Sequence, residues 1–313
     1  MDYKLLTQKI NEYNTIILHG HIRPDGDCYG SQFGLKELIL NNFKNKNVYV
    51  VGEVSDYVKF LGDLDVIEDS LYKDALCISL DTGSGDRVSD QRYFSGKEKI
   101  KLDHHIPLDQ YGDINIVDEH APACAYLVAK YAIEENLEIN EKCATILYTG
   151  IVTDTGRFRH GITDDLFKIA GILLNKGADT KYIDTRLSIE SLNSLKLKGY
   201  VLSNFVTTEE GLAYVKLPLD VINEFNVSQE EAANQVGTIS SIETCPVWTI
   251  FVESEKGVRC RIRSRGPHVD KIANKYNGGG HQMSCGANFN SMDEISDIIK
   301  DLNKLVEEYK ASL

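Results

Sequence analysis

The chain has 313 residues and a formal net charge of −13, with 42% hydrophobic residues. This length favours two domains with a sizeable core, and the acidic balance excludes a protein that binds duplex DNA through clustered Lys and Arg. The seven cysteines form no C-x-x-C pair, and no 18 uncharged apolar residues occur together. We therefore expect a cytoplasmic protein that does not enter a membrane.

The N-terminal half alternates two kinds of apolar pattern. Short apolar runs predict strands at residues 15–18, 48–51, 75–80, 100–102 and 114–117. Helical spacing is found at 30–40, 123–135, 141–153 and 164–174. Strands that alternate with helices predict a parallel sheet covered on both faces. We expect an α/β domain with a doubly wound, mostly parallel sheet over residues 1–187, and a polar, mostly helical linker at 188–202.

A smaller α/β domain is expected over residues 203–313, with strands at 212–217, 247–252 and 258–265 and a helix at 292–309. Alternation in the third strand places four arginines on one face, Arg259, Arg261, Arg263 and Arg265. A glycine run, Gly278-Gly279-Gly280, follows and ends at His281. The arginines could simply balance acidic neighbours, and the glycines could form a flexible turn. Alternatively, guanidinium groups and side-chain-free backbone form a phosphate site.

Polar residues collect at the ends of the predicted N-terminal strands. His21, Asp25 and Asp27 follow the first strand, Asp81 ends the third, and Asp103-His104-His105 ends the fourth; Asp154 ends the helix at 141–153. Taken singly, such residues are usually solvated turns, helix caps or surface loops. Because strand ends meet at one edge of a parallel sheet, we expect these side chains to converge there. His19 is expected to pack within its strand or to support the loop that follows, outside the site.

The convergent residues have the chemistry of a metal site. Asp25 and Asp27 are two positions apart, a spacing that we expect to require a cation between them. Imidazole and carboxylate ligands together suit Mn²⁺, Fe²⁺, Co²⁺ or Zn²⁺. Four carboxylates and two imidazoles are too many for one ion, and two ions about 3.5–4 Å apart would hold a bridging hydroxide for attack on phosphorus. The site therefore predicts hydrolysis of a phosphate ester.

The segment 98–102 mixes charged residues with Ile100 and Leu102. This pattern predicts a short strand whose end meets solvent. Successive residues of an extended chain point to opposite sides, so Asp103 and His104 cannot both face one ion unless the chain bends. We expect one to be a metal ligand and its neighbour to support it.

Together these motifs resemble the DHH phosphoesterase family with a C-terminal DHHA1 domain, over essentially the whole chain. The resemblance rests on His21-x-x-x-Asp25-x-Asp27 with Gly30-Ser31, on Asp81-Thr82, on Asp103-His104-His105, on Asp154-Thr155-Gly156, and on Arg263-Ser264 with Gly278-Gly279-Gly280-His281. Each motif alone is weak, but five in this order are highly specific.

The resemblance implies a role for each residue. One Mn²⁺ would be held by His21, Asp25 and Asp81, and a second by Asp27, Asp81, His104 and Asp154, with Asp81 bridging. Asp103 would orient neighbouring groups and His105 would face the substrate, so these two are the expected catalytic residues. The substrate would be bound in the second domain by Arg263, Ser264, Gly279, Gly280 and His281.

Within the family, the chain most resembles NrnA-like enzymes, which degrade very short RNAs and dephosphorylate 3′-phosphoadenosine 5′-phosphate. Expected partners are short single-stranded RNA or DNA oligonucleotides of about 2–5 nucleotides and small nucleotides, with a homodimer left open. Alternatives are a phosphodiesterase for linear or cyclic dinucleotides, an inorganic pyrophosphatase, a long-strand exonuclease and a catalytically silent nucleotide-binding protein. The chain departs from the family pattern at Cys28-Tyr29, at Arg157 and at 282–285, without loss of an expected ligand.

Overall fold

The computed structural model describes residues 2–106 and 109–313. The chain divides into two compact units, Met1–Ile189 and Glu190–Leu313. Most of the segment predicted as a linker is helix α7 (Leu192–Asn204), which belongs to the second unit and buries Leu197 and Val201 in its core. No helix in the described ranges is long and apolar enough to cross a membrane.

The first unit contains the predicted parallel sheet. Its strands are β1 (Thr15–His19), β2 (Asn47–Val51), β3 (Leu76–Leu80), β4 (Glu98–Asp103) and β5 (Ile114–Val117). They pair in the order β2-β1-β3-β4-β5, and all pairs are parallel. The apolar, β-branched runs at 15–18 and 76–80 form the buried strands β1 and β3, next to each other in the sheet. The expected fold class is confirmed.

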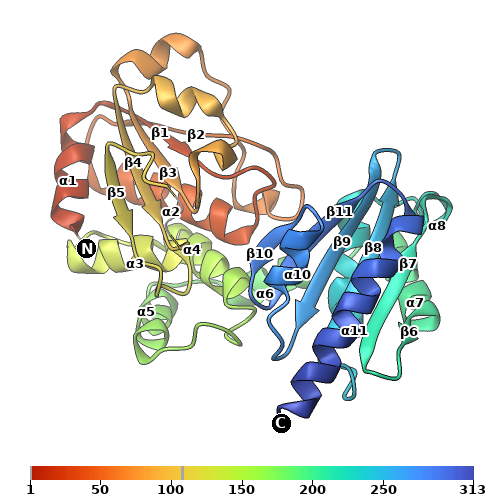
Figure 1. Cartoon of the computed structure of the whole chain (residues 1–313). Helices are drawn as coiled ribbons and strands as arrows, with labels where there is room; N and C mark the ends of the chain where they lie inside the picture. The colour runs from red at the N-terminus through yellow and green to blue at the C-terminus, as the bar shows by residue number, and fades with distance from the viewer. Residues whose placement is uncertain (1, 107–108) are drawn as a thin grey trace. The chain divides into compact units, whose positions relative to one another are not determined.

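Helices cover one face of this sheet. They are α1 (Tyr3–Glu12), which the sequence reasoning missed, α2 (Gly26–Asn42), α3 (Cys124–Glu134) and α4 (Glu141–Asp154), and they share one core with the strands. Figure 1 shows α2, α3 and α4 along this side. The other face is covered by 3-10 turns at Asp69–Asp74 and Gln91–Ser95, which bury Tyr72 and Tyr93. Helices α5 (Asp164–Asn175) and α6 (Thr180–Ser188) complete the unit.

Helices α2 and α4 cross at two glycines. A Cβ on Gly30 would lie 2.7 Å from the Cα of Gly150, so neither backbone leaves room for a side chain. A Cβ on Gly150 would also lie 3.0 Å from Oδ1 of Asp27. This close crossing therefore determines where Asp27 on α2 and Asp154 on α4 lie relative to each other.

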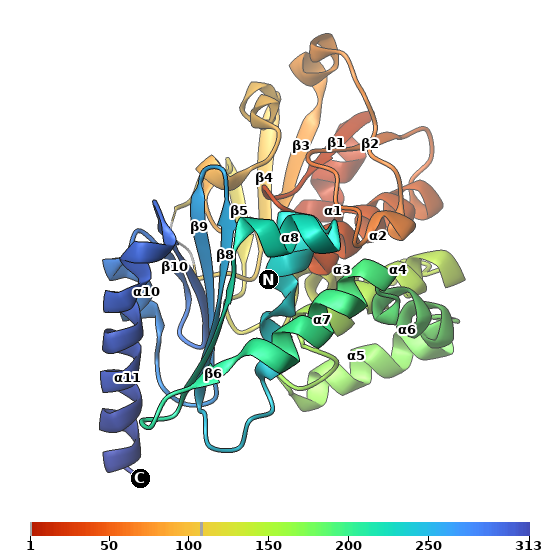
Figure 2. The ribbon, with the colours of Figure 1, turned by 90° about the vertical axis from the view of Figure 1, so that its right-hand side faces the viewer.

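The second unit has a mixed six-stranded sheet in the order β10-β11-β9-β8-β7-β6, in which only β7 and β8 pair in parallel. The strands are β6 (Val206–Thr207), β7 (Leu212–Leu217), β8 (Val247–Ser254), β9 (Gly257–Ser264), β10 (Gly279–His281) and β11 (Ser284–Phe289). Helices α7, α8 (Leu219–Phe225) and α9 (Gln229–Asn234) pack on one face, and α10 (Asp270–Lys275) and α11 (Ser296–Ala311) on the other. Figure 2 shows α11 and α7 on opposite sides of this sheet.

Candidate metal centre

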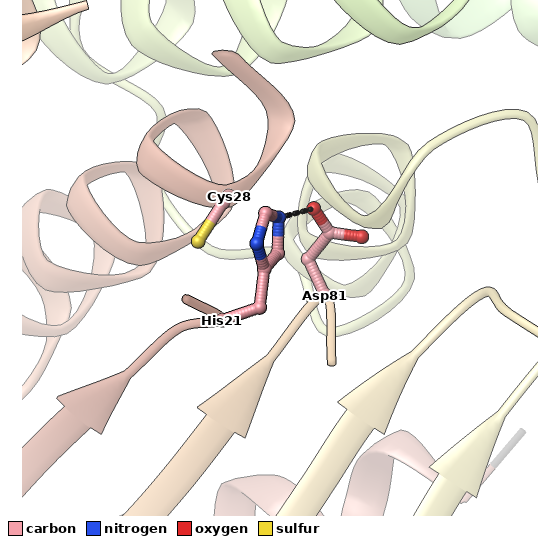
Figure 3. Close-up of side chains that lie close together, drawn as sticks. All are labelled: His21, Cys28 and Asp81. Atoms are coloured by element: carbon pink, nitrogen blue, oxygen red, sulfur yellow. Dashed lines mark ion pairs between the residues drawn. The ribbon is translucent and has the colours of Figure 1, made fainter. Parts of the chain in front are cut away.

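Three neighbouring strands end at the candidate site. His21 lies two residues beyond β1, Asp81 directly follows β3, and β4 ends at Asp103, so that His104 and His105 come next. Because β1, β3 and β4 are adjacent, their carboxyl ends bring these side chains together, as open parallel sheets commonly do. Figure 3 shows the His21 ring between the thiol of Cys28 on α2 and the carboxylate of Asp81.

Asp81 is the central residue of this group. Its side chain is buried, and its backbone has a φ of 54°, a left-handed conformation that Asp adopts more readily than most residues. The backbone N–H donates to the carbonyl of Leu102, which holds the turn after β3 against β4. Burial raises the pKa of the Asp81 carboxyl, but the nearby imidazoles of His104 and His21 outweigh this and lower it.

Two imidazoles point at Asp81 with the same ring atom. In His21, Nδ1 lies 2.9 Å from the carbonyl of Ile22, and in His104 it lies 3.1 Å from that of Ala121. A carbonyl at Nδ1 places the ring proton there in the neutral form and leaves Nε2 as the ligand atom. Nε2 of His21 is 3.5 Å from Asp81 Oδ2, and Nε2 of His104 is 3.2 Å from Asp81 Oδ1.

The two aspartates of the first motif serve different helices. Asp25 caps α2, because its Oδ1 accepts from the backbone N–H groups of Asp27 and Cys28. Asp27 lies in the first turn of α2 and not in a loop, and its carboxylate accepts from the first two N–H groups of α3, those of Cys124 and Ala125. Both negative charges are therefore stabilised by helix N-termini. Each carboxylate thus has backbone donors of its own, and the need for a cation between them stays a prediction.

Asp27 and Asp154 form the side of the site opposite His21. Nε2 of His104 lies 3.8 Å from Asp27 Oδ2 and 3.5 Å from Asp154 Oδ2. Burial and the neighbouring carboxylate of Asp81 raise the pKa of Asp154 to about 7, and the same two causes raise that of Asp27. Burial lowers the pKa of His104, but Asp81, Asp27 and Asp154 together raise it to about 11. Carboxylates packed this closely require positive charge among them.

The donor set fits divalent metal ions. Among the described residues, three groups place their ligand atoms within 4.8 Å of one another, namely His21 with Cys28 and Asp81, Asp81 with His104 and His105, and Asp27 with His104 and Asp154. No described donor is aligned for a hydrogen bond with the buried Asp81 Oδ1, an atom that a cation would satisfy. Asp25 lies at the edge, with Oδ1 3.8 Å from His21 Nε2. Sequence reasoning did not include Cys28, although it adjoins the Asp25-Gly26-Asp27 motif.

Asp103 and His105 lie beside this group. Oδ1 of Asp103 is 2.8 Å from Nδ1 of His105, whose side chain is 31% exposed. Asp103 itself is fully buried, and so is Lys101. The expectation that the end of this strand meets solvent was therefore wrong, because loop carbonyls and a tyrosine ring enclose it.

The four arginines on β9 and directly after it have different partners. Arg259 and Arg261 form ion pairs with Glu230 on α9, so acidic neighbours balance these two. Arg265 donates to the carbonyls of Ile242 and Cys245 and stacks over the single tryptophan. Among the described residues, Arg263 donates only to backbone carbonyls, those of Ile262 and Cys285. Ser264 is buried and donates to the carbonyl of Pro267.

The glycine run forms an edge strand, β10, and the turn before it. A Cβ on Gly278 would lie 1.9 Å from the carbonyl oxygen of Gly286, and one on Gly280 would lie 2.6 Å from that of Ser284. Packing against β11 therefore explains these two glycines. A Cβ on Gly279 would meet only Asn274, at 3.4 Å, so packing does not require glycine there. His281 ends β10 with an exposed side chain.

Comparison with known proteins agrees with this arrangement. Residues 15–151 match the DHH family, N-terminal domain, and residues 209–308 match the DHHA1 domain. The bifunctional oligoribonuclease and PAP phosphatase NrnA of Bacillus subtilis is 38% identical over 309 residues, which cover 97% of this chain and 99% of that protein. A probable NrnA of Streptococcus mutans is 36% identical, with coverage of 97% and 99%.

Among solved structures, an exopolyphosphatase-related protein from Bacteroides fragilis superposes with a TM-score of 0.88 at 25% identity, covering 99% of this chain and 96% of that one. Sequence identity to the two relatives extends over both units, and the two family models divide between them. The chain therefore belongs to the DHH family, with an N-terminal DHH domain followed by a DHHA1 domain.

Proposed function

We propose that the protein is a metal-dependent phosphoesterase that hydrolyses oligonucleotides of about 2–5 nucleotides to mononucleotides and removes the 3′-phosphate of 3′-phosphoadenosine 5′-phosphate. The observation that carries this proposal is the convergence of two imidazole Nε2 atoms on the buried carboxylate of Asp81. The relatives from B. subtilis and S. mutans are named as an oligoribonuclease and PAP phosphatase, and these names supply the substrate class.

Two divalent cations, most suitably Mn²⁺, would polarise the phosphoryl oxygens and supply a hydroxide nucleophile at neutral pH. His21, Asp25 and Asp81 would hold one ion, and Asp27, Asp81, His104 and Asp154 the other. The carbonyls of Ile22 and Ala121 keep the two imidazoles oriented for this task. The backbone N–H groups at the start of α2 hold the carboxylate of Asp25 in place, and those at the start of α3 hold that of Asp27.

His105 would act on the substrate itself. Its Nδ1 is held by Asp103, and its partly exposed ring can donate a proton to the oxygen that leaves phosphorus. Burial lowers the pKa of His105, but the hydrogen bond to Asp103 and the charge of Asp81 raise it, which favours the protonated form. We assign His105 as the general acid and Asp103 as the residue that orients it.

The second domain would bind the far end of the substrate. Among the described residues, Arg263 has no carboxylate partner, unlike Arg259 and Arg261. Its guanidinium is therefore available for a phosphate. Gly279 lacks a packing reason to be glycine and would allow its backbone to approach an anion. Ser264, Gly280 and His281 adjoin these two residues and complete the proposed substrate site.

An end-labelled RNA trinucleotide incubated with Mn²⁺ tests this function. We expect stepwise release of mononucleotides, phosphate release from 3′-phosphoadenosine 5′-phosphate, and loss of both reactions when a chelator removes the metal. Parallel rates on a linear dinucleotide and on a 24-nucleotide strand separate a dinucleotide phosphodiesterase and a long-strand exonuclease from the proposed enzyme. Binding of these nucleotides without hydrolysis under Mn²⁺, Mg²⁺ or Co²⁺ would instead indicate a silent nucleotide-binding protein.

A further inference from the structure

Lys101 is a fully buried lysine in the middle of the first unit. Its Nζ donates to the carbonyl of Gly83 at 2.8 Å and to that of Asp109 at 3.2 Å, and lies 3.3 Å from Oδ2 of Asp103. The Tyr111 ring lies below it, with the ring centroid 4.9 Å from Nζ. Two carbonyl acceptors, a carboxylate at ion-pair distance and an aromatic face suit the ammonium group of a lysine.

Such an ion pair is a poor way to gain stability. Removing an ammonium and a carboxylate from water costs several kcal/mol per ion, which their attraction offsets only in part, so apolar residues of similar volume serve a core as well or better. The strand already supplies Ile100 and Leu102 to the apolar core on its other face. The buried Lys101–Asp103 pair therefore calls for a reason other than packing.

The carboxylate of Asp103 divides its two oxygens between two partners. Oδ2 faces Lys101 at 3.3 Å, and Oδ1 faces Nδ1 of His105 at 2.8 Å. The three residues alternate along the chain, so their side chains lie on the same side of β4 and its extension. Asp103 is therefore a buried carboxylate that lies between the side chains of Lys101 and His105.

The acceptors of Lys101 also belong to the loops that carry the site. Gly83 comes two residues after Asp81, and Asp109 comes four residues after His105. These loops are joined a second time by Tyr111, whose hydroxyl donates to the carbonyl of Thr82 at 2.8 Å. Lys101 therefore connects, through one atom, the loop of the central metal ligand, the loop of His105 and the carboxylate that orients His105.

We propose that Lys101 is a positioning residue for the reaction, which holds Asp103 and the two loops so that Asp103 presents His105 to the leaving group. Lys101 is buried, and its contacts are with Gly83, Asp103, Asp109 and Tyr111, none of which is a proposed metal ligand. It therefore acts on the reaction through Asp103 and His105. The proposal rests on the proposed hydrolase function and on the part given there to His105. It predicts that loss of the ammonium lowers turnover and leaves metal and substrate binding nearly intact.

A double-mutant cycle between Lys101→Met and His105→Ala tests the proposal. Methionine keeps the length of the side chain without its charge. We expect Lys101→Met to lower kcat on 3′-phosphoadenosine 5′-phosphate about 10–100-fold, with KM and Mn²⁺ stoichiometry within about twofold of wild type. In the His105→Ala background the same change should lower kcat less than threefold, because both substitutions interrupt one chain of contacts. Lys99→Met is the matched control, since Lys99 lies on the same side of β4 and pairs with Asp113.

Equal losses from Lys101→Met in both backgrounds would overturn the proposal, because they would mean that Lys101 supports the fold without acting through His105. Full activity of His105→Ala would overturn the role of His105 and, with it, the positioning role of Lys101, while the hydrolase function would stand. An inactive wild-type protein would instead refute the proposed function. The ¹⁵N resonances of the His105 ring give an independent measurement, and they should change in Lys101→Met and stay constant in Lys99→Met.

If Lys101→Met does not fold, because the charge of Asp103 is left alone, Lys101→Met/Asp103→Asn provides a neutral pair for the same cycle. The proposal requires that adding His105→Ala to this pair lowers kcat less than threefold. A further loss as large as that of His105→Ala in the wild type contradicts it, because His105 would then work without either partner.

Discussion

The two units handle charge in opposite ways. In the first unit, charged groups from three strand ends and two helices converge on the buried Asp81. In the second unit, three arginines lie on β9 and a fourth directly follows it, but Glu230 neutralises two of the four and backbone carbonyls accept from the others. A row of like charges in a sequence therefore does not by itself make a site. Around Asp81 the carboxylates raise one another's pKa, so that group still favours added positive charge, whereas the charges of Arg259 and Arg261 are already balanced.

The largest expected effect comes from removing the centre of convergence. Asp81→Ala takes away the carboxylate that both His21 and His104 face, and we expect kcat to fall at least ~1000-fold, since the Lewis-acid contribution of the metals is worth several kcal/mol. Mn²⁺ bound per chain, measured by elemental analysis, should fall as well. The exposed Asp86, five residues further along, provides the control Asp86→Ala. Unchanged turnover in Asp81→Ala would show that the convergence is not the active site.

The next effect concerns acid stability of the first unit. His19 is fully buried between the rings of Tyr72 and Tyr93, and burial lowers its pKa to about 4, while the nearby Asp90 opposes this shift and Arg92 adds to it. The unfolded chain binds this proton near pH 6.5 and the folded chain does not. Stability from this group is therefore complete above pH 6.5 and is lost as the pH falls toward 4, by up to about 3 kcal/mol.

His19→Leu should remove this dependence, so that the difference in unfolding free energy between variant and wild type changes by about 3 kcal/mol from pH 7 to pH 4. Urea unfolding by circular dichroism measures it, and fluorescence of Trp248, the single tryptophan, reports separately on the second unit. His268→Leu on the exposed surface of the second unit is the control. If the unfolding free energies of His19→Leu and wild type change in parallel with pH, burial of a neutral His19 does not cause the acid destabilisation.

Much of this arrangement could be predicted from the sequence. Apolar runs gave the five parallel strands, and the polar residues at their ends gave the group around Asp81, because period-2 and period-3.6 patterns reflect which faces are buried. The burial of Lys101 could not be predicted, since its acceptors come from loop carbonyls at Gly83 and Asp109. Helix α1 was missed although Tyr3, Leu6 and Ile10 have helical spacing. The pairing of Glu230 with β9 depends on a packing of α9 that no local pattern encodes.

A smaller effect is expected at the α2–α4 crossing. A Cβ added by Gly150→Ala would lie 2.5 Å from the Cβ of Ala125 and 3.0 Å from Asp27 Oδ1, so the helices must move apart. Overpacking of this kind costs about 1–3 kcal/mol, and here it also displaces a proposed metal ligand. The midpoint of thermal unfolding should fall, and the Mn²⁺ dissociation constant should rise. Gly171→Ala on α5, where a Cβ meets nothing within 4 Å, should instead stabilise by up to about 1 kcal/mol. Equal behaviour of the two variants would contradict the close crossing.

The smallest effect separates two arginines of the same strand. Arg263→Gln should raise KM for 3′-phosphoadenosine 5′-phosphate about tenfold with little change in kcat, because the lost charge-assisted bond is to a phosphate that does not react. Arg259→Gln should change KM less than about twofold, since Arg259 already pairs with Glu230 at the surface. Steady-state kinetics on both variants, at saturating Mn²⁺, compares two guanidinium groups. Arg259 pairs with Glu230, whereas Arg263 has no acidic partner among the described residues. If Arg259→Gln raises KM as much as Arg263→Gln, then all four arginines act together as a basic strip, and local neutralisation by Glu230 does not decide which of them binds substrate.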